Sequence, residues 1–192
     1  REPNRFVMLP ANAREGHKRV LQKMRLAEGI SESTPLNRIE SLGKKDGTAI
    51  VASGPAYTYL MEFADDLKGD LFKLGLTNPI PKTKLSAFLR EAKRVVVFEE
   101  LEPYLEDQLR ALANEYDLRV EIYGKAQGLL PRTGELDPDL VAEALVRLEM
   151  LDPKTIQRIR DTKVPKIPVR PPVLCPGCGH RGVAYAARQA SR

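Results

Sequence analysis

The stretch RVVVFEELEPYLEDQLRALANEY, residues 94–116, decides the fold of this chain. Residues 95–98 form a short apolar run, mainly β-branched and without polar alternation, which is typical of a strand covered on both faces. A helix with one buried face is predicted next, formed by Leu105, Leu109, Leu112 and Tyr116. The stretch therefore predicts a β-α unit at the centre of a sheet.

Three acids, Glu99, Glu100 and Glu102, lie between this strand and its helix. Pro103 suits the first helical turn, where its missing N–H would have no partner, and the helix dipole favours negative charge there. We therefore predict a structural role for these acids rather than a catalytic one.

The same β-α alternation recurs on both sides of the central unit. Three further strands are predicted, at residues 48–53, 71–78 and 118–124. The Asp137-Pro138 pair, a capping residue followed by proline, predicts the start of another helix. Crossovers of this length give an α/β fold with a mostly parallel sheet and helices on both faces.

The two ends of the chain differ in composition from this α/β body, which we place at residues 47–163. Residues 1–46 are expected to form an N-terminal arm or linker arriving from a preceding domain, with His17 solvated. Residues 164–174 hold four prolines and predict an extended strap, and the segment 164–192 resembles a linker running into the start of another domain. We expect a soluble segment cut from a longer chain.

The distribution of charge argues against a nucleic-acid partner. The formal net charge is +5, but residues 162–192 hold six basic side chains and no acid, which leaves the rest of the chain near neutrality. Neither part combines a basic face with interleaved aromatic residues. No apolar run approaches the roughly 20 residues needed to span a bilayer, so a membrane role is not expected either.

The motif CPGCGHR, residues 175–181, is the one dense functional signal. Cys175 and Cys178 can bind one metal or cluster iron, and Gly177 and Gly179 allow backbone N–H groups to approach an anion at a helix start near His180. The residues alone leave four interpretations open: a partial metal or cluster site, an anion-binding loop, a dithiol switch, and a structural turn. The C-x-x-C spacing favours a reducing compartment, the cytoplasm.

Several separate motifs resemble the thiamine-diphosphate-dependent 2-oxoacid:ferredoxin oxidoreductases, and among them the α subunit of the indolepyruvate branch. These motifs are MLPANAR, GLTNPIP, VVVFEELEPYLEDQLR and RPPVLCPGCGHR. The resemblance implies a three-layer α/β/α sandwich similar to the transketolase C-terminal domain for the body. It also implies that residues 171–192 begin a diphosphate-binding domain.

The resemblance further implies oxidative decarboxylation of indolepyruvate to indoleacetyl-CoA, a step in aromatic amino acid catabolism. Thiamine diphosphate with Mg²⁺, 4Fe-4S clusters, coenzyme A, ferredoxin and a β subunit would take part. Cys175 and Cys178 match cluster ligands, and Gly177, Gly179 and His180 match the loop beside the cofactor. No residue is assigned to catalysis.

The magnesium ligands and the cysteine-rich tail of the family are missing from this sequence. We therefore expect an accessory, interface domain that alone binds no cofactor and is inactive. A rival interpretation is a small adaptor that binds metal or cycles as a dithiol through Cys175 and Cys178.

Overall fold

The computed structural model describes residues 6–43, 46–160, 166, 168 and 173–191. The chain forms two compact units, residues 1–160 and 161–192, which are described separately. The predicted proline-rich strap, residues 164–174, lies largely outside the described residues.

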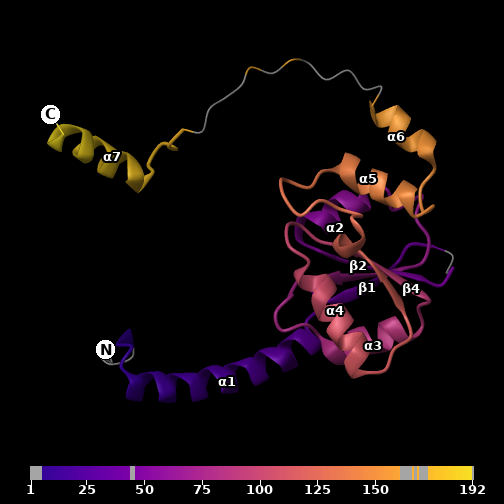
Figure 1. Ribbon diagram of the computed structural model, residues 1–192, viewed down its shortest axis with the longest axis horizontal. Helices are drawn as coiled ribbons and strands as arrows, with labels where there is room; N and C mark the ends of the chain where they lie inside the picture. The colour runs from indigo at the N-terminus through magenta and orange to yellow at the C-terminus, as the bar shows by residue number, and fades with distance from the viewer. Residues whose placement is uncertain (1–5, 44–45, 161–165, 167, 169–172, 192) are drawn as a thin grey trace. The chain divides into compact units, whose positions relative to one another are not determined.

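The first unit holds one sheet and six of the α-helices (Figure 1). The strands are β1 (Arg38–Ser41), β2 (Thr48–Ser53), β3 (Asp70–Leu74), β4 (Arg94–Phe98) and β5 (Glu121–Tyr123). The helices are α1 (Pro10–Ser33), α2 (Gly54–Met61), α3 (Lys82–Arg90), α4 (Tyr104–Glu115), α5 (Pro138–Arg147) and α6 (Pro153–Arg160), with a short 3-10 turn at Lys125–Gln127. The second unit contains α7 (Gly179–Ala190).

The sheet has the order β1-β3-β2-β4-β5, and every pair except β1 with β3 is parallel. The predicted α/β fold with a mostly parallel sheet is thus confirmed. The apolar run of residues 95–98 lies in β4, which pairs with a strand on each side. Val96 lies opposite Ile50 of β2 and Tyr123 of β5. Val95, Val96, Val97 and Phe98 are all buried, as a doubly covered strand requires.

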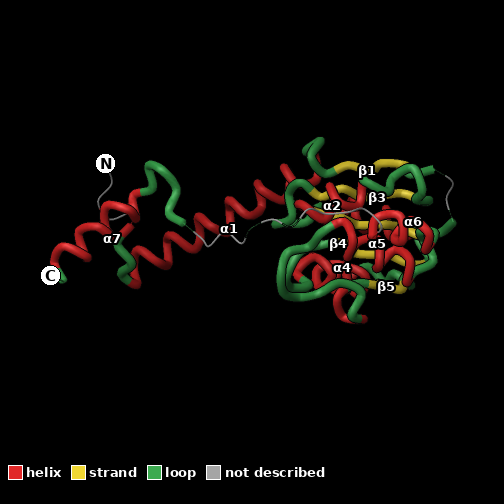
Figure 2. The backbone as a smooth tube through the Cα atoms, turned by 90° about the horizontal axis from the view of Figure 1, so that it is seen from above, coloured by secondary structure: helices red, strands yellow, loops and turns green. Residues whose placement is uncertain are grey.

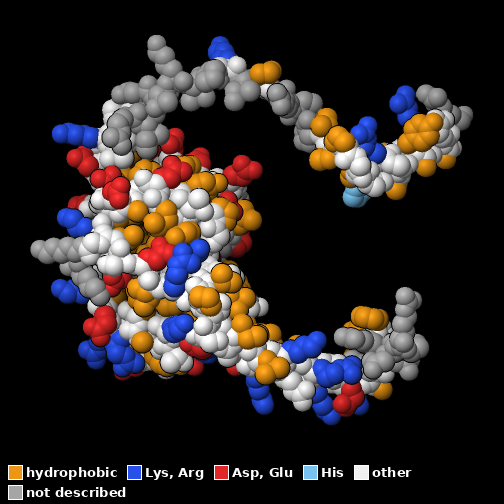
Figure 3. Space-filling model, turned by 180° about the vertical axis from the view of Figure 1, so that it is seen from behind, with side chains coloured by type: hydrophobic (Ala, Val, Ile, Leu, Met, Phe, Trp, Pro, Cys, Tyr) orange, Lys and Arg blue, Asp and Glu red, His pale blue; other side chains and the backbone are white. Residues whose placement is uncertain are grey.

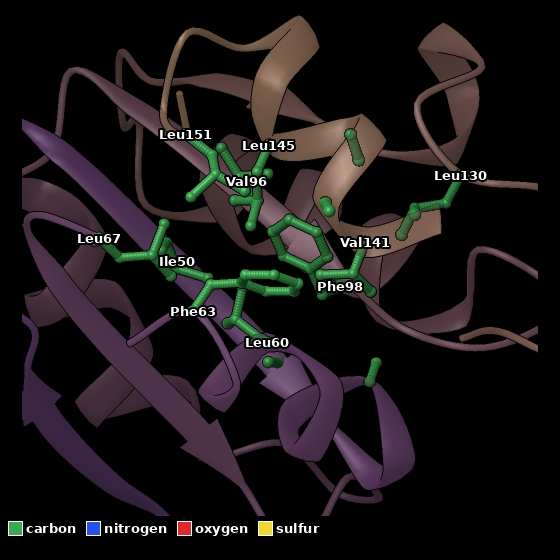
Figure 4. Close-up of a cluster of buried hydrophobic side chains, with 14 of the residues drawn as sticks. Ile50, Leu60, Phe63, Leu67, Val96, Phe98, Leu130, Val141, Leu145 and Leu151 are labelled. Carbon is green, nitrogen blue, oxygen red and sulfur yellow. The ribbon is translucent and has the colours of Figure 1, made fainter. Parts of the chain in front are cut away.

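Helices cover both faces of the sheet and make it the middle of three layers (Figure 1). Figure 2 looks down on the α5 side and shows the strands side by side, with β1 and β5 at opposite edges. On one face α2 and α5 enclose a core that includes Ile50, Leu60, Phe98 and Val141 (Figure 4). On the other face α3 and α4 pack over a second core, in which the rings of Phe72 and Phe88 meet edge to face with centroids 5.3 Å apart. Each buried aromatic or leucine side chain contributes about 2 kcal/mol of transfer free energy, so these two cores hold the unit together.

Helix ends follow the predicted signals. The Asp137 carboxylate accepts a hydrogen bond from the N–H of Leu140 at 2.8 Å, which is the predicted cap of α5. Leu105, Leu109 and Leu112 of α4 are buried, and Tyr116 is half-buried. Pro103 lies at the N-cap of α4.

The structure differs from the predicted strands in three respects. The strand expected at 71–78 is β3, Asp70–Leu74, which ends four residues earlier. The strand expected at 118–124 is reduced to Glu121–Tyr123. A fifth strand, β1, comes from the segment expected to be an arm or linker and pairs antiparallel with β3. This strand was not predicted because two of its four residues are charged. One of them, Glu40, accepts a hydrogen bond from the Tyr57 hydroxyl of α2, so this polar strand helps to hold a helix.

Candidate functional site

The predicted cofactor loop is a tight turn that leads into α7. The N–H of Cys178 donates to the carbonyl of Cys175 at 3.0 Å, and Gly177 between them has φ +81°, a conformation that favours glycine. Cys178 is the N-cap residue of α7, so the helix starts at Gly179, one residue before the predicted start at His180. The structure thus brings the five predicted site residues into one turn and the first residues of a helix.

The two thiols of this loop are free. Cys175 is exposed and Cys178 is half-buried. The Cys178 Sγ lies 3.3 Å from Nδ1 of His180, so the imidazole is in direct contact with one thiol. Within residues 6–43, 46–160 and 173–191, no group of three His, Cys, Asp or Glu side chains is arranged to hold a metal ion. Two thiols supply only half of a tetrahedral ligand set.

The geometry of the loop fits an anion at the start of α7. The Cys178 side chain makes no capping hydrogen bond to the helix, and the N–H of Arg181 donates to the Cys178 carbonyl at 3.1 Å. The N–H groups of Gly179 and His180 are therefore the first-turn donors that an outside acceptor could meet. A Cβ built on Gly177 or Gly179 would meet nothing within 4 Å, which leaves room for a ligand to approach the backbone. The helix itself has no buried residue, and Val183 and Tyr185 are 70% and 66% exposed.

A second group of charged residues lies where β4 ends. The Glu99 carboxylate accepts from the N–H groups of Leu105 and Glu106, at 2.6 and 2.8 Å. These are orphan donors in the first turn of α4, so Glu99 caps this helix from the preceding loop. Burial raises the pKa of Glu99, although these two hydrogen bonds favour its charged form. The predicted structural role of this acid agrees with these contacts.

Glu106 and Lys125 complete this buried charge cluster. The Glu106 carboxylate accepts from the N–H of Lys125 at 2.7 Å and from Nη2 of Arg110 at 2.7 Å. Lys125 Nζ donates to the carbonyl of Pro131 at 2.6 Å, and burial lowers the pKa of this lysine. Sequence reasoning missed Lys125, because a lysine after a strand-ending glycine resembles an ordinary surface residue.

The buried cluster is a finished structural network rather than a reactive site. Every buried side-chain nitrogen and oxygen in the described part of the chain has a hydrogen-bond partner. Glu99, Glu106 and Lys125 therefore fix the start of α4 and the segment after β5, and leave no group aimed at a substrate. The loop at Cys175–His180 remains the candidate for cofactor binding.

Comparison with known proteins places the sequence among curated relatives. No protein-family model matches it. It is 37% identical to the indolepyruvate oxidoreductase subunit IorA of Methanothermobacter thermautotrophicus and 35% identical to that of Thermococcus kodakarensis. Both similarities cover 100% of this chain, but only 31% and 30% of the relatives. The chain thus spans about a third of their length.

Among solved structures, the chain is similar to a 2-oxoglutarate:ferredoxin oxidoreductase from Magnetococcus marinus, with a TM-score of 0.46 and 17% identity. The similarity covers 80% of this chain and 24% of that protein. No helix among the described residues is long and apolar enough to cross a membrane.

Proposed function

Since this chain shares a family with the IorA subunits of indolepyruvate oxidoreductases, we propose that it acts as an accessory and interface segment of a longer subunit of that kind. The observation that carries this proposal is similarity along the whole chain at 37% identity. The complete enzyme would oxidatively decarboxylate indolepyruvate to indoleacetyl-CoA in the cytoplasm, together with a β subunit, coenzyme A and ferredoxin.

The loop before α7 would supply this segment's share of the cofactor site. Cys175 and Cys178 would ligate a 4Fe-4S cluster, with further ligands from outside this chain. The backbone N–H groups around Gly177, Gly179 and His180 would face a diphosphate group. Thiamine diphosphate with Mg²⁺, when bound, supplies the carbanion chemistry of decarboxylation. The exposed Cys175, the half-buried but unoxidised Cys178 and the open backbone on this loop support the assignment.

The test compares the longer subunit, assembled with its partner, with this chain alone. We expect indolepyruvate-dependent reduction of a viologen dye by the assembled enzyme and none by the isolated chain. In the assembled enzyme, C175S and C178S should lower both the iron content and the rate of dye reduction. The control S191A, beyond the far end of α7, should change neither. An unchanged iron content in both cysteine variants would refute the cluster assignment.

A second candidate function is a small metal-binding or dithiol adaptor, favoured by the direct contact between Cys178 and His180. Anaerobic analysis of iron, sulfide and zinc in this chain alone separates the two. A metal-free protein supports the accessory segment. Stoichiometric metal that is lost in C175S would favour the adaptor.

A further inference from the structure

Helix α1 carries an apolar stripe that the described residues cover only in part. Its members recur at helical spacing and are Ala13, Val20, Met24 and Ala27. The next position on the same face is Ser31, which is the one buried residue of this 24-residue helix. Val20 is 52% exposed. Ala13, Met24 and Ala27 are half-buried. The face that contacts the body at Ser31 therefore continues along the helix with only partial cover.

Hydrogen bonds attach the C-terminal end of α1 to the rest of the first unit. Ser31 Oγ donates to the carbonyl of Pro79 at 2.7 Å, and Nδ2 of Asn37 donates to the Ser31 carbonyl at 3.0 Å. The Glu32 carboxylate accepts from the N–H of Thr83, at the start of α3, at 2.6 Å. These contacts fix the orientation of α1, so the stripe faces the same way whether or not a partner is bound.

A groove of about 750 Å³ opens where α1 ends. Its lining includes Ser33 and Thr34 from the end of α1, Ile39 of β1, and Ala87 and Phe88 of α3. Ile39 pairs with the buried Phe72 of β3, yet it remains 55% exposed. Helices normally cover both faces of a mostly parallel sheet, so this part of the α3 side lacks the expected layer.

Charge decides which partner suits this surface. The helix carries five basic side chains, Arg14, Lys18, Arg19, Lys23 and Arg25 (Figure 3). Only three acids accompany them, and one of these, Glu32, already caps α3. Two α1 helices placed stripe to stripe would bring like charges together, which is destabilising. The surface suits an apolar partner with an acidic rim.

We propose that the α1 stripe and the adjacent groove form the surface against which the other segments of a longer IorA-type subunit pack. This inference rests on the proposed function. The relatives match this chain along its whole length, α1 included, and about two thirds of their sequence lies outside the matched region. An amphipathic helix gains most of its stability from such packing, so α1 needs this cover.

The test is hydrogen–deuterium exchange of the α1 amides, in this chain alone and in the longer subunit. Residues 13–27 should exchange about 100-fold more slowly in the longer subunit, because cover suppresses local opening. V20D and M24D in the longer subunit should restore fast exchange, and the control L26D, away from the stripe, should not. Leu26 is 70% exposed, so an acid there buries no charge.

Equal exchange of residues 13–27 in the two proteins would overturn the inference. If the α1 amides of this chain alone are protected, and if that protection grows with protein concentration, the inference is overturned in favour of a second copy. Dye reduction by the longer subunit assembled with its partner is a separate readout. An inactive assembled enzyme with a protected α1 would count against the proposed activity and not against the packing surface.

Discussion

At the scale of single residues, Asn37 joins three segments of the chain. Its side chain is buried, with 2% exposure. Oδ1 accepts from the N–H groups of Gly75 and Leu76, at 3.0 and 2.9 Å, while Nδ2 donates to the carbonyls of Ser31 and Leu76. One amide thus connects the end of α1, the start of β1 and the end of β3.

Replacing Asn37 with alanine should lower the free energy of unfolding by about 1–3 kcal/mol. The change removes the acceptor of the half-buried Leu76 N–H, whereas the N–H of the exposed Gly75 still donates to the Leu36 carbonyl at 3.2 Å. It also removes the hydrogen bonds that Nδ2 donates to the carbonyls of Ser31 and Leu76. Urea denaturation followed by circular dichroism measures the effect. The control N114A, at an exposed position of α4, should change stability by less than about 0.5 kcal/mol. Equal effects in the two variants would contradict this assignment.

Lys125→Met should destabilise the protein strongly at neutral pH and less in acid. Without Lys125, the buried Glu99 loses a favourable Coulomb interaction, whereas Glu106 keeps its ion pair with Arg110. Removing one member of such a buried cluster costs roughly 3 kcal/mol. Burial already raises the pKa of Glu99 above its ordinary value of 4.5, and losing Lys125 raises that pKa further. A carboxyl with a raised folded-state pKa contributes stability below pH 4.5 that is lost as pH rises through that pKa.

The measurement for Lys125→Met is urea unfolding at pH 4 and pH 8. The loss of stability should be larger at pH 8. The matched control is R132M, because Arg132 is an exposed cation 3.9 Å from Glu102, and it should lose less than about 0.5 kcal/mol at either pH. A loss for Lys125→Met that is independent of pH would show that its hydrogen bond to Pro131 matters and its charge does not.

At the scale of elements, α1 supplies the cap that α3 lacks. The N-cap residue of α3 is Pro81, which offers no side-chain acceptor, and Glu32 of α1 takes that role. Glu32→Ala should therefore cost about 1 kcal/mol and speed amide exchange in the first turn of α3. The control E15A removes an exposed ion pair with Lys18 and should leave that turn unchanged. Unaltered exchange at Thr83 would refute the cap.

Strand β4 was predictable from sequence and β1 was not, for a physical reason. Four consecutive apolar residues determine β4 locally, and burial on both faces needs no other information. In β1 only Ile39 is apolar, and its pairing depends on contacts distant in sequence, from Asn37 to Gly75 and from Glu40 to Tyr57. Local sequence patterns cannot predict contacts between residues that are this far apart in the chain.

The candidate site and the buried charge cluster also combine features that local sequence predicts with features that it does not. Spacing alone was enough to choose the loop at Cys175–His180 as the candidate, but it left four interpretations open, and the role of the loop stays a prediction. Sequence could predict neither the contact of Cys178 with His180 nor the burial of Lys125, since both depend on side-chain placement in space. The structural use of Glu99 was predictable because its cap lies within seven residues.

At the scale of the whole molecule, the buried residues of both hydrophobic cores lie within residues 49–151, and the partly buried residues packed against them lie within 42–156. Removing residues 161–192 should therefore leave the unfolding of the first unit unchanged, with a midpoint shift of less than about 2 °C, because less than about 0.5 kcal/mol is lost. Differential scanning calorimetry of the chain with and without these residues checks this. A drop of 5 °C or more would mean that the second unit stabilises the first.

Strand β1 also bears on how the protein behaves in concentrated solution. It occupies the outer edge of the sheet with four residues, and charged Arg38 and Glu40 alternate with Ile39 and Ser41. Short, charged edges are poor templates for strand addition by other chains. Its inner neighbour β3 carries Leu71, Phe72 and Leu74, all of which are buried. If β1 detached, this apolar strand would become the edge, and aggregation would compete with refolding.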